Sequence, residues 1–170
     1  MKKKVAFVIP VCNEAKNIPK LIAALKRSMD QLSHIYTLNF VDDGSTDYSL
    51  DVLKAQSHIY SNVFYISLSR NFGHQNALKA GLDTVEGDCM IMMDADMQHP
   101  PELVPALLKK WEEGFDVVYT IRKDHREAPL LKRKTSNLFY QFVNSLSDIE
   151  LEEGTADFRL LDKKVVTVFR

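Results

Sequence analysis

Apolar and amphipathic segments alternate along the first 121 residues, and this alternation constrains the fold more than any other feature of the sequence. Five short runs rich in Val, Ile and Phe have the length of buried strands, and they cover residues 5–11, 35–41, 63–68, 89–93 and 115–121. Helices with one apolar face are predicted between them, over residues 18–32, from 48, over 75–85 and over 100–114. Strands that alternate with helices predict an α/β fold with a mostly parallel, doubly wound sheet.

Polar clusters follow each of the first four apolar runs. In order along the chain they read "PVCNE", "DDGSTD", "SRNFGHQN" and "DADMQH". In open α/β sheets, ligands bind beyond the carboxyl ends of the strands. We therefore expect the four clusters to gather along one edge of the sheet and to form a ligand site there.

Asp94 and Asp96 directly follow the fourth apolar run. Two carboxylates that repel each other in a folded site need an offsetting charge, and a divalent cation supplies it. Hard oxygen ligands at alternate positions suit Mg²⁺ or Mn²⁺, and Gln98 could add another oxygen. A short acidic pair is a weak signal alone, and the alternative is a solvated loop.

The second cluster contains adjacent acids, Asp42 and Asp43. Turn formation and capping explain Gly44 and Ser45, as well as Asp47, which is the expected N-cap of the next helix. Those roles do not require two adjacent acids. A carboxylate at this position could accept hydrogen bonds from a nucleobase or from ribose hydroxyls.

Basic residues mark two further candidate anion sites. Arg70 precedes a turn and a helix start that favour a phosphate, whereas His74 is as well explained as a helix cap and Lys79 as a solvated side chain. Residues 122–134 hold six Lys/Arg and two Asp/Glu, which suits a phosphate or lipid headgroups, or else a solvated loop.

Asp157 lies in an apolar, aromatic setting, either as a partner of Arg159 or as a general base.

Composition and charge exclude several classes of protein. Lys and Arg total 22 against 23 Asp and Glu, so the basic excess of a general nucleic-acid binder is missing. The two cysteines, Cys12 and Cys89, form neither metal-ligand spacing nor a disulfide framework. No run approaches the ~20 apolar residues of a membrane span. The apolar pattern continues to the last residue, which predicts that the chain is part of a longer protein.

The clusters in this order resemble the family 2 glycosyltransferases with the GT-A (nucleotide-diphospho-sugar transferase) fold. The matching stretches are "VIPVCNEAKNI", "FVDDGSTD", "SRNFGHQNALKAGL", "MDADMQHPPE" and "GTADFRLLD". The narrower resemblance, carried by "DADMQHPPE", the basic segment and "DFRLLD", is to polyprenyl-phosphate glycosyltransferases. That branch includes dolichyl-phosphate mannose synthases and bactoprenol glucosyltransferases.

The resemblance implies a role for each matching position. Residues 1–121 would form the Rossmann-like part that binds the nucleotide sugar, and 122–170 the acceptor side of the same domain, truncated before C-terminal membrane helices. The residues expected to contact the donor are Pro10, Val11, Asn13, Glu14, Asp42, Asp43, Arg70, Asp94 and Gln98. Asp94, Asp96 and Gln98 would hold Mg²⁺ or Mn²⁺, Arg122 and Arg126 the lipid phosphate, and Asp157 and Asp96 would be catalytic.

The implied reaction is transfer of a hexose, with inversion, from a UDP- or GDP-sugar to undecaprenyl or dolichyl phosphate. The whole protein would then work at the cytoplasmic face of a membrane, and assembly of identical copies is left open. The alternatives are a family 2 enzyme with a cell-wall or surface-polysaccharide acceptor, and a non-catalytic relative that binds nucleotide sugars. A nucleotidyltransferase is disfavoured because no glycine-rich loop follows the first strand. A receiver-like signalling module is disfavoured because its acid pair follows the first strand, whereas the adjacent acids of this chain follow the second.

Overall fold

The computed structural model of the chain describes residues 2–121 and 155–170, with the side chains of 155–157 outside the description. The chain divides into two compact units, residues 1–118 with 157–170, and residues 119–156. Of the second unit, only the strand residues 119–121 and 155–156 are described. The predicted acceptor residues Arg122 and Arg126 lie outside the described residues, so the role predicted for them stays a prediction.

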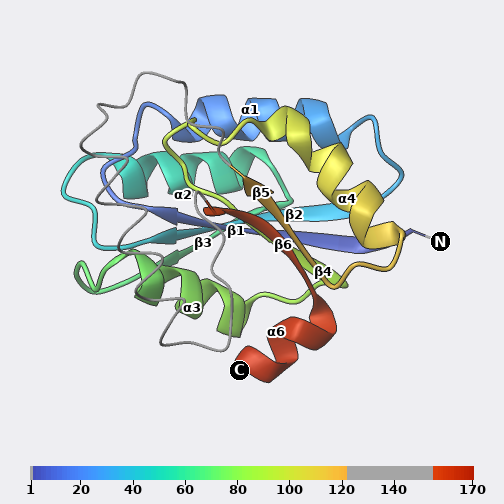
Figure 1. Cartoon of the computed structure of the whole chain (residues 1–170). Helices are drawn as coiled ribbons and strands as arrows, with labels where there is room; N and C mark the ends of the chain where they lie inside the picture. The colour runs from blue at the N-terminus through green and yellow to red at the C-terminus, as the bar shows by residue number, and fades with distance from the viewer. Residues whose placement is uncertain (1, 122–154) are drawn as a thin grey trace, which may run out of the picture. The chain divides into compact units, whose positions relative to one another are not determined.

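A six-stranded sheet forms the centre of the fold, in the order β3-β2-β1-β4-β6-β5 (Figure 1). Its strands are β1 (Lys4–Val11), β2 (Ile35–Asp42), β3 (Val63–Ser67), β4 (Cys89–Met92), β5 (Val117–Ile121) and β6 (Thr155–Asp162). Strand β1 pairs in parallel with both β2 and β4, and β2 pairs in parallel with β3. Strand β6 runs antiparallel to β4. The predicted mostly parallel sheet is therefore confirmed.

Helices cover both faces of this sheet. They are α1 (Ile18–Met29), α2 (Ser49–Ile59), α3 (His74–Thr84), the short 3₁₀ turn η1 (Pro101–Leu103), α4 (Val104–Glu112) and α6 (Lys163–Phe169). Helices α1, α2 and α4 lie on one face, and α3 and α6 on the other (Figure 1). Strand β1 is buried from Val5 to Val11, because it lies between two strands and under helices on both sides.

The differences from the predicted elements are local. Helix α1 ends at Met29, before the end of the apolar pattern, and α2 has Tyr48 as its N-cap. Asp47 still accepts a hydrogen bond from the amide of Ser49 at 2.8 Å, so it satisfies a helix-end donor one position early. The antiparallel strand β6 was not assigned from the sequence, because its apolar pattern fits a strand and a helix equally.

Asp162 joins the last strand to the helices around it. Its Oδ2 atom accepts a hydrogen bond from Trp111 Nε1 at 2.6 Å, and its Oδ1 atom accepts from the Lys164 amide at 2.9 Å, which caps α6. Partial burial opposes ionisation of this carboxyl, but the hydrogen bonds from Trp111 and Lys164 outweigh it and lower the Asp162 pKa. The ionised form of Asp162 therefore stabilises the folded state.

The lowered pKa predicts a pH-dependent contribution to stability. A depressed carboxyl pKa adds stability at neutral pH that is lost as the pH falls through the folded-state pKa, below about pH 4. We expect Asp162→Asn to be less stable than the wild type at pH 7, and the two unfolding free energies to converge in acid. Urea titrations at several pH values check this. A difference in unfolding free energy between Asp162→Asn and the wild type that is the same at every pH would contradict it.

Candidate active site

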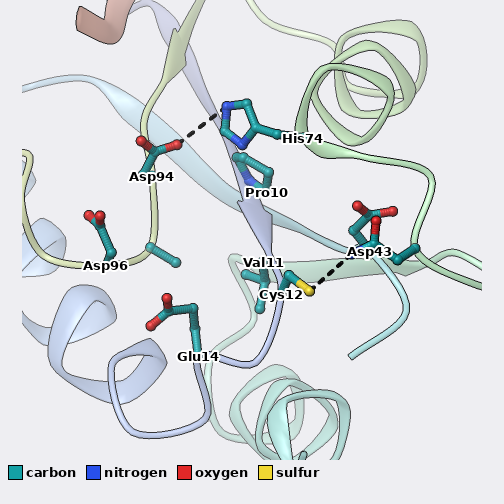
Figure 2. Close-up of a pocket in the computed structure, with 10 residues that line it drawn as sticks. Pro10, Val11, Cys12, Glu14, Asp43, His74, Asp94 and Asp96 are labelled. Atoms are coloured by element: carbon teal, nitrogen blue, oxygen red, sulfur yellow. Dashed lines mark hydrogen bonds and ion pairs between the residues drawn. The ribbon is translucent and has the colours of Figure 1, made fainter. Parts of the chain in front are cut away.

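A cavity of about 300 Å³ lies beyond the carboxyl ends of the parallel strands. In the strand order, β2 and β3 lie on one side of β1 and β4 lies on the other, so the order reverses between β1 and β4. Open α/β sheets bind ligands at such a point. Ten residues from the four polar clusters line it: Pro10, Val11, Cys12, Glu14, Asp43, Asn71, His74, Asp94, Ala95 and Asp96 (Figure 2). The clusters therefore gather at one edge, as predicted.

Asp94 and Asp96 both line this cavity, on the side opposite Asp43 (Figure 2). The Asp94 side chain is 31% exposed. The Asp96 Oδ1 atom accepts the amide hydrogen of Gln98 at 2.9 Å, and Met97 between them has a positive φ of 65°. This tight turn follows directly after β4 and holds both carboxylates at the sheet edge.

His74 approaches the acidic pair from another element. It is the first residue of α3, and its Nε2 atom lies 3.5 Å from Asp94 Oδ1 (Figure 2). The sequence left His74 as a possible helix cap, whereas the fold brings its ring into the cavity. Because the contact joins the loop after β3 to the loop after β4, it depends on strand order and not on local sequence.

Asn13 joins the first two polar loops. It has a positive φ of 61°, and its Oδ1 atom accepts the amide hydrogens of Thr46 at 2.8 Å and Asp47 at 3.2 Å. The Asn13 amide in turn donates to Ser45 Oγ at 3.0 Å. Asn13 thus fixes the shape of the loops around the cavity without lining it, although Glu14 next to it does.

Asp42 and Asp43 have different surroundings. Asp43 lines the cavity, and its two carboxylate oxygens accept the amide hydrogens of Phe72 at 2.7 Å and Gly73 at 2.9 Å. Asp42 is 2% exposed and accepts the Ser45 amide hydrogen at 3.2 Å. Both acids hold loops in place, and this explains why two adjacent carboxylates are needed. Their predicted contacts with a nucleotide stay predictions.

Neither Arg70 nor Lys79 lines the cavity. The Arg70 guanidinium lies over the Phe72 ring at 4.8 Å from its centroid. Lys79 pairs with Asp83 one helical turn away, at 2.6 Å, as a solvated helix side chain would. Of the other predicted residues that the structure describes, Gln98 also lies outside the cavity lining, and Asp157 lies on β6 with an undescribed side chain.

The donor set suits a divalent cation that is shared with a substrate. Within residues 2–121 and 158–170, whose side chains the structure describes, no three His, Cys, Asp or Glu side chains converge as a complete protein metal site. Asp94 and Asp96 supply two carboxylates from one loop beside a cavity. Mg²⁺ and Mn²⁺ are commonly bound in this way, through one or two carboxylates with water and substrate phosphates completing the shell. The residues present therefore fit such an ion.

Besides His74, three residues of the cavity were not singled out as ligand contacts from the sequence. Cys12 and Asn71 contact each other, with Asn71 Nδ2 at 3.3 Å from Cys12 Sγ, and Ala95 lies between the two acids. All three belong to the polar clusters that end the strands. Their place in a cluster was a usable signal, but their side-chain types carry no chemistry that marks them.

The sheet order, with acidic residues at the carboxyl ends of its strands, is that of the GT-A fold. The model of the family "Glycosyl transferase family 2" matches residues 6–169, so the chain belongs to the family 2 glycosyltransferases. It is 42% identical over 160 residues to the uncharacterized glycosyltransferase YkcC of Bacillus subtilis, covering 94% of this chain and 50% of that protein. It is 37% identical over 163 residues to the prophage bactoprenol glucosyl transferase homolog of Escherichia coli, covering 96% and 53%. The chain thus spans about half the length of these relatives.

Solved structures of other transferases share the fold. Glucosyl-3-phosphoglycerate synthase from Mycobacterium tuberculosis, in complex with Mn²⁺, UDP and phosphoglyceric acid, matches with a TM-score of 0.68 and 20% identity, covering 96% of this chain and 57% of that one. The mannosyltransferase PcManGT from Pyrobaculum calidifontis, in complex with GDP-Man and Mn²⁺, matches with a TM-score of 0.65 and 16% identity, covering 99% and 47%. At these identities the likeness shows the fold alone.

Proposed function

We propose that this chain is the catalytic part of an inverting glycosyltransferase that moves a hexose from a UDP- or GDP-sugar to a polyprenyl phosphate. The observation that carries the proposal is the position of Asp94 and Asp96, which line a cavity at the carboxyl edge of the sheet together with residues of three other loops. At about 300 Å³ the cavity reaches the lower end of the range for small-molecule sites. The bactoprenol glucosyl transferase homologues support the choice of acceptor.

The donor's diphosphate would lie against the acidic loop. A divalent ion held there by Asp94 and Asp96, with Gln98 assisting, would supply positive charge to the diphosphate as it leaves. Asp43, across the cavity from the acidic loop, and Glu14 would bound the nucleotide, and their carboxylates can accept hydrogen bonds from base or ribose. Arg70, held over Phe72, would add a second positive charge near the phosphates.

The transfer itself is a single displacement. An oxygen of the acceptor phosphate forms a bond to the anomeric carbon while the bond from that carbon to the diphosphate breaks, and the diphosphate leaves with the electron pair. Attack from the face opposite the leaving group inverts the configuration. The acceptor phosphate is already an anion near neutral pH, so it needs little deprotonation.

Asp157 would orient the acceptor or accept a proton from it. Strand β6 carries this residue and runs antiparallel to β4, with Met92 paired to Arg159. Continued for two residues in the same register, the pairing would bring position 157 beside Asp94 at the end of β4. The proposed roles of Arg122 and Arg126 in binding the acceptor phosphate concern residues outside the described parts of the chain.

The proposal places the whole protein at the cytoplasmic face of a membrane, where polyprenyl phosphates are accessible. In the part of the chain that the structure describes, no helix has both the length and the apolar character needed to span a bilayer.

Binding of the donor is expected to raise the melting temperature only when Mn²⁺ is present. A ligand at 100 times its dissociation constant stabilises the folded state by about 2.7 kcal/mol, which corresponds to roughly 5–10 °C for a chain of this size. Thermal-shift measurements with UDP- and GDP-sugars, each with Mn²⁺ or with a chelator, test this and identify the base.

Transfer is then tested with the sugar that binds. Radiolabelled hexose should move into an organic-soluble product when undecaprenyl or dolichyl phosphate is added. Donor binding without transfer to a lipid phosphate would leave a family 2 enzyme with another acceptor. Absence of any metal-dependent shift would contradict the proposal.

A further inference from the structure

The loop that carries the acidic pair is closed by His99. The imidazole Nδ1 atom accepts the amide hydrogen of Asp94 at 3.0 Å, so the side chain of the last loop residue binds the backbone of the first. His99 is 7% exposed and does not line the cavity. His99 therefore contacts Asp94 from the protein interior and not from the cavity.

The same ring also reaches the Asp94 carboxylate. A nitrogen that accepts a hydrogen bond carries no proton, so the proton of the neutral ring is on Nε2. The Nε2 atom lies 3.8 Å from Asp94 Oδ2. One imidazole thus fixes the main chain of Asp94 and approaches its side chain, while His74 contacts the other carboxylate oxygen at 3.5 Å.

The plane of the His99 ring is itself fixed by stacking. The rings of His99 and Phe158 have centroids 5.4 Å apart and an interplanar angle of 19°. Phe158 is fully buried and lies on β6, directly after Asp157. The orientation of Asp94 is therefore coupled through His99 to the strand that carries the proposed acceptor-side residue.

We propose that His99 is a positioning residue for the divalent cation, which it serves by holding Asp94 in the orientation that binds the ion together with the donor's diphosphate. This inference rests on the proposed function. Groups that orient a metal ligand without touching the metal typically change metal affinity by 10- to 100-fold when they are removed. We expect an effect of that size here, expressed through Asp94.

Two substitutions separate the hydrogen bond from the stacking. His99→Phe keeps a ring against Phe158 but removes the acceptor for the Asp94 amide. His99→Asn keeps an acceptor, because its side-chain oxygen takes the place of Nδ1, but removes the ring. His58→Phe, at an exposed position on α2, is the matched control.

Metal affinity and stability should rank the two variants in opposite orders. We expect His99→Phe to weaken Mn²⁺ binding by about 10- to 100-fold, and His99→Asn by less. Melting temperatures should fall more for His99→Asn, which loses the stacked ring. Free Mn²⁺ is measured by electron paramagnetic resonance on the intact protein, with UDP in one series and GDP in the other. A purely structural residue would give the same order in both measurements.

Amide exchange reports on the loop without any metal. The Asp94 amide should be protected from hydrogen exchange in the wild type and in His99→Asn, and exposed in His99→Phe. Mn²⁺ affinity of folded His99→Phe within twofold of the wild type would overturn this role while leaving the proposed function intact. If the wild-type protein fails to bind Mn²⁺ both in the presence of UDP and in the presence of GDP, the proposed function is overturned, and this role with it.

Discussion

Replacing Asp96 by asparagine is expected to lower the rate of sugar transfer by about 1,000-fold. Stabilising the charge of a leaving diphosphate through a bound cation contributes several kcal/mol to the transition state, and about 4 kcal/mol corresponds to a factor of 1,000. Asparagine keeps a side-chain oxygen that can accept the Gln98 amide hydrogen, as Asp96 Oδ1 does at 2.9 Å. The substitution therefore removes the negative charge while preserving the turn.

The measurements that accompany the rate separate a lost metal site from a damaged fold. The ligand-free melting temperature of Asp96→Asn should stay close to that of the wild type, whereas the Mn²⁺-dependent shift with donor should disappear. Asp51→Asn removes an exposed carboxylate from α2, paired with Lys54 at 3.5 Å, and should change neither quantity. Metal-dependent transfer by Asp96→Asn at a tenth of the wild-type rate or more would contradict the role of this acid.

Replacing Gly44 by alanine is expected to destabilise the protein by about 2–4 kcal/mol and to weaken donor binding. Gly44 has a φ of +65°, a conformation that costs of order 1 kcal/mol or more for a residue with a Cβ atom. A Cβ atom at this position would also lie only 2.5 Å from the amide nitrogen of Asn71 and 2.7 Å from Arg70 Cα. Overpacking of this kind adds roughly 1–3 kcal/mol.

The clash at Gly44 is with backbone, so it cannot be relieved by a side-chain rotation. The loop after β3 would have to move away from the loop after β2. That movement would strain the hydrogen bonds from Phe72 and Gly73 to Asp43, which hold Asn71 beside the cavity. We therefore expect the stability loss to be accompanied by weaker binding of the nucleotide sugar.

Gly114→Ala is the matched control for Gly44→Ala. Gly114 also has a positive φ, of +104°, but nothing lies within 4 Å of the position that its Cβ would take. It should therefore show a conformational cost without a steric clash, with donor affinity unchanged. Because φ at Gly114 lies further from the left-handed region than φ at Gly44, this cost is at least as large as the conformational cost of Gly44→Ala, and a greater loss in Gly44→Ala by urea denaturation reports the steric contact. Equal losses of stability in the two variants would show that the approach of the two loops is not tight.

Much of the fold follows from local sequence patterns. The apolar runs predicted β1 to β4 to within one residue at their ends, because buried parallel strands require continuous Val, Ile, Leu or Phe. Helix ends were less predictable. Helix α1 ends at Met29 although apolar residues continue beyond it, since packing against neighbouring elements sets the end of a helix as much as periodicity does.

The position of Asp94 and Asp96 at the cavity could be predicted, because they directly follow a buried strand and ligands bind at that edge of an open α/β sheet. The contacts of the surrounding residues could not be predicted. Asn13 and Asp43 were expected to contact the donor, but their hydrogen bonds to the neighbouring loops join residues 29 to 34 positions apart. His99 stacks on Phe158 of another strand. Only the strand order brings these partners together.

By itself, then, the sequence determined the alternation of strands and helices and the edge at which polar residues collect, Asp94 and Asp96 among them, because periodicity and charge are local properties. The tertiary structure decided the antiparallel placement of β6, the entry of His74 into the cavity, and the stacking of His99 on Phe158. Those contacts join segments that are distant in the chain, so their geometry exists only once the sheet has formed.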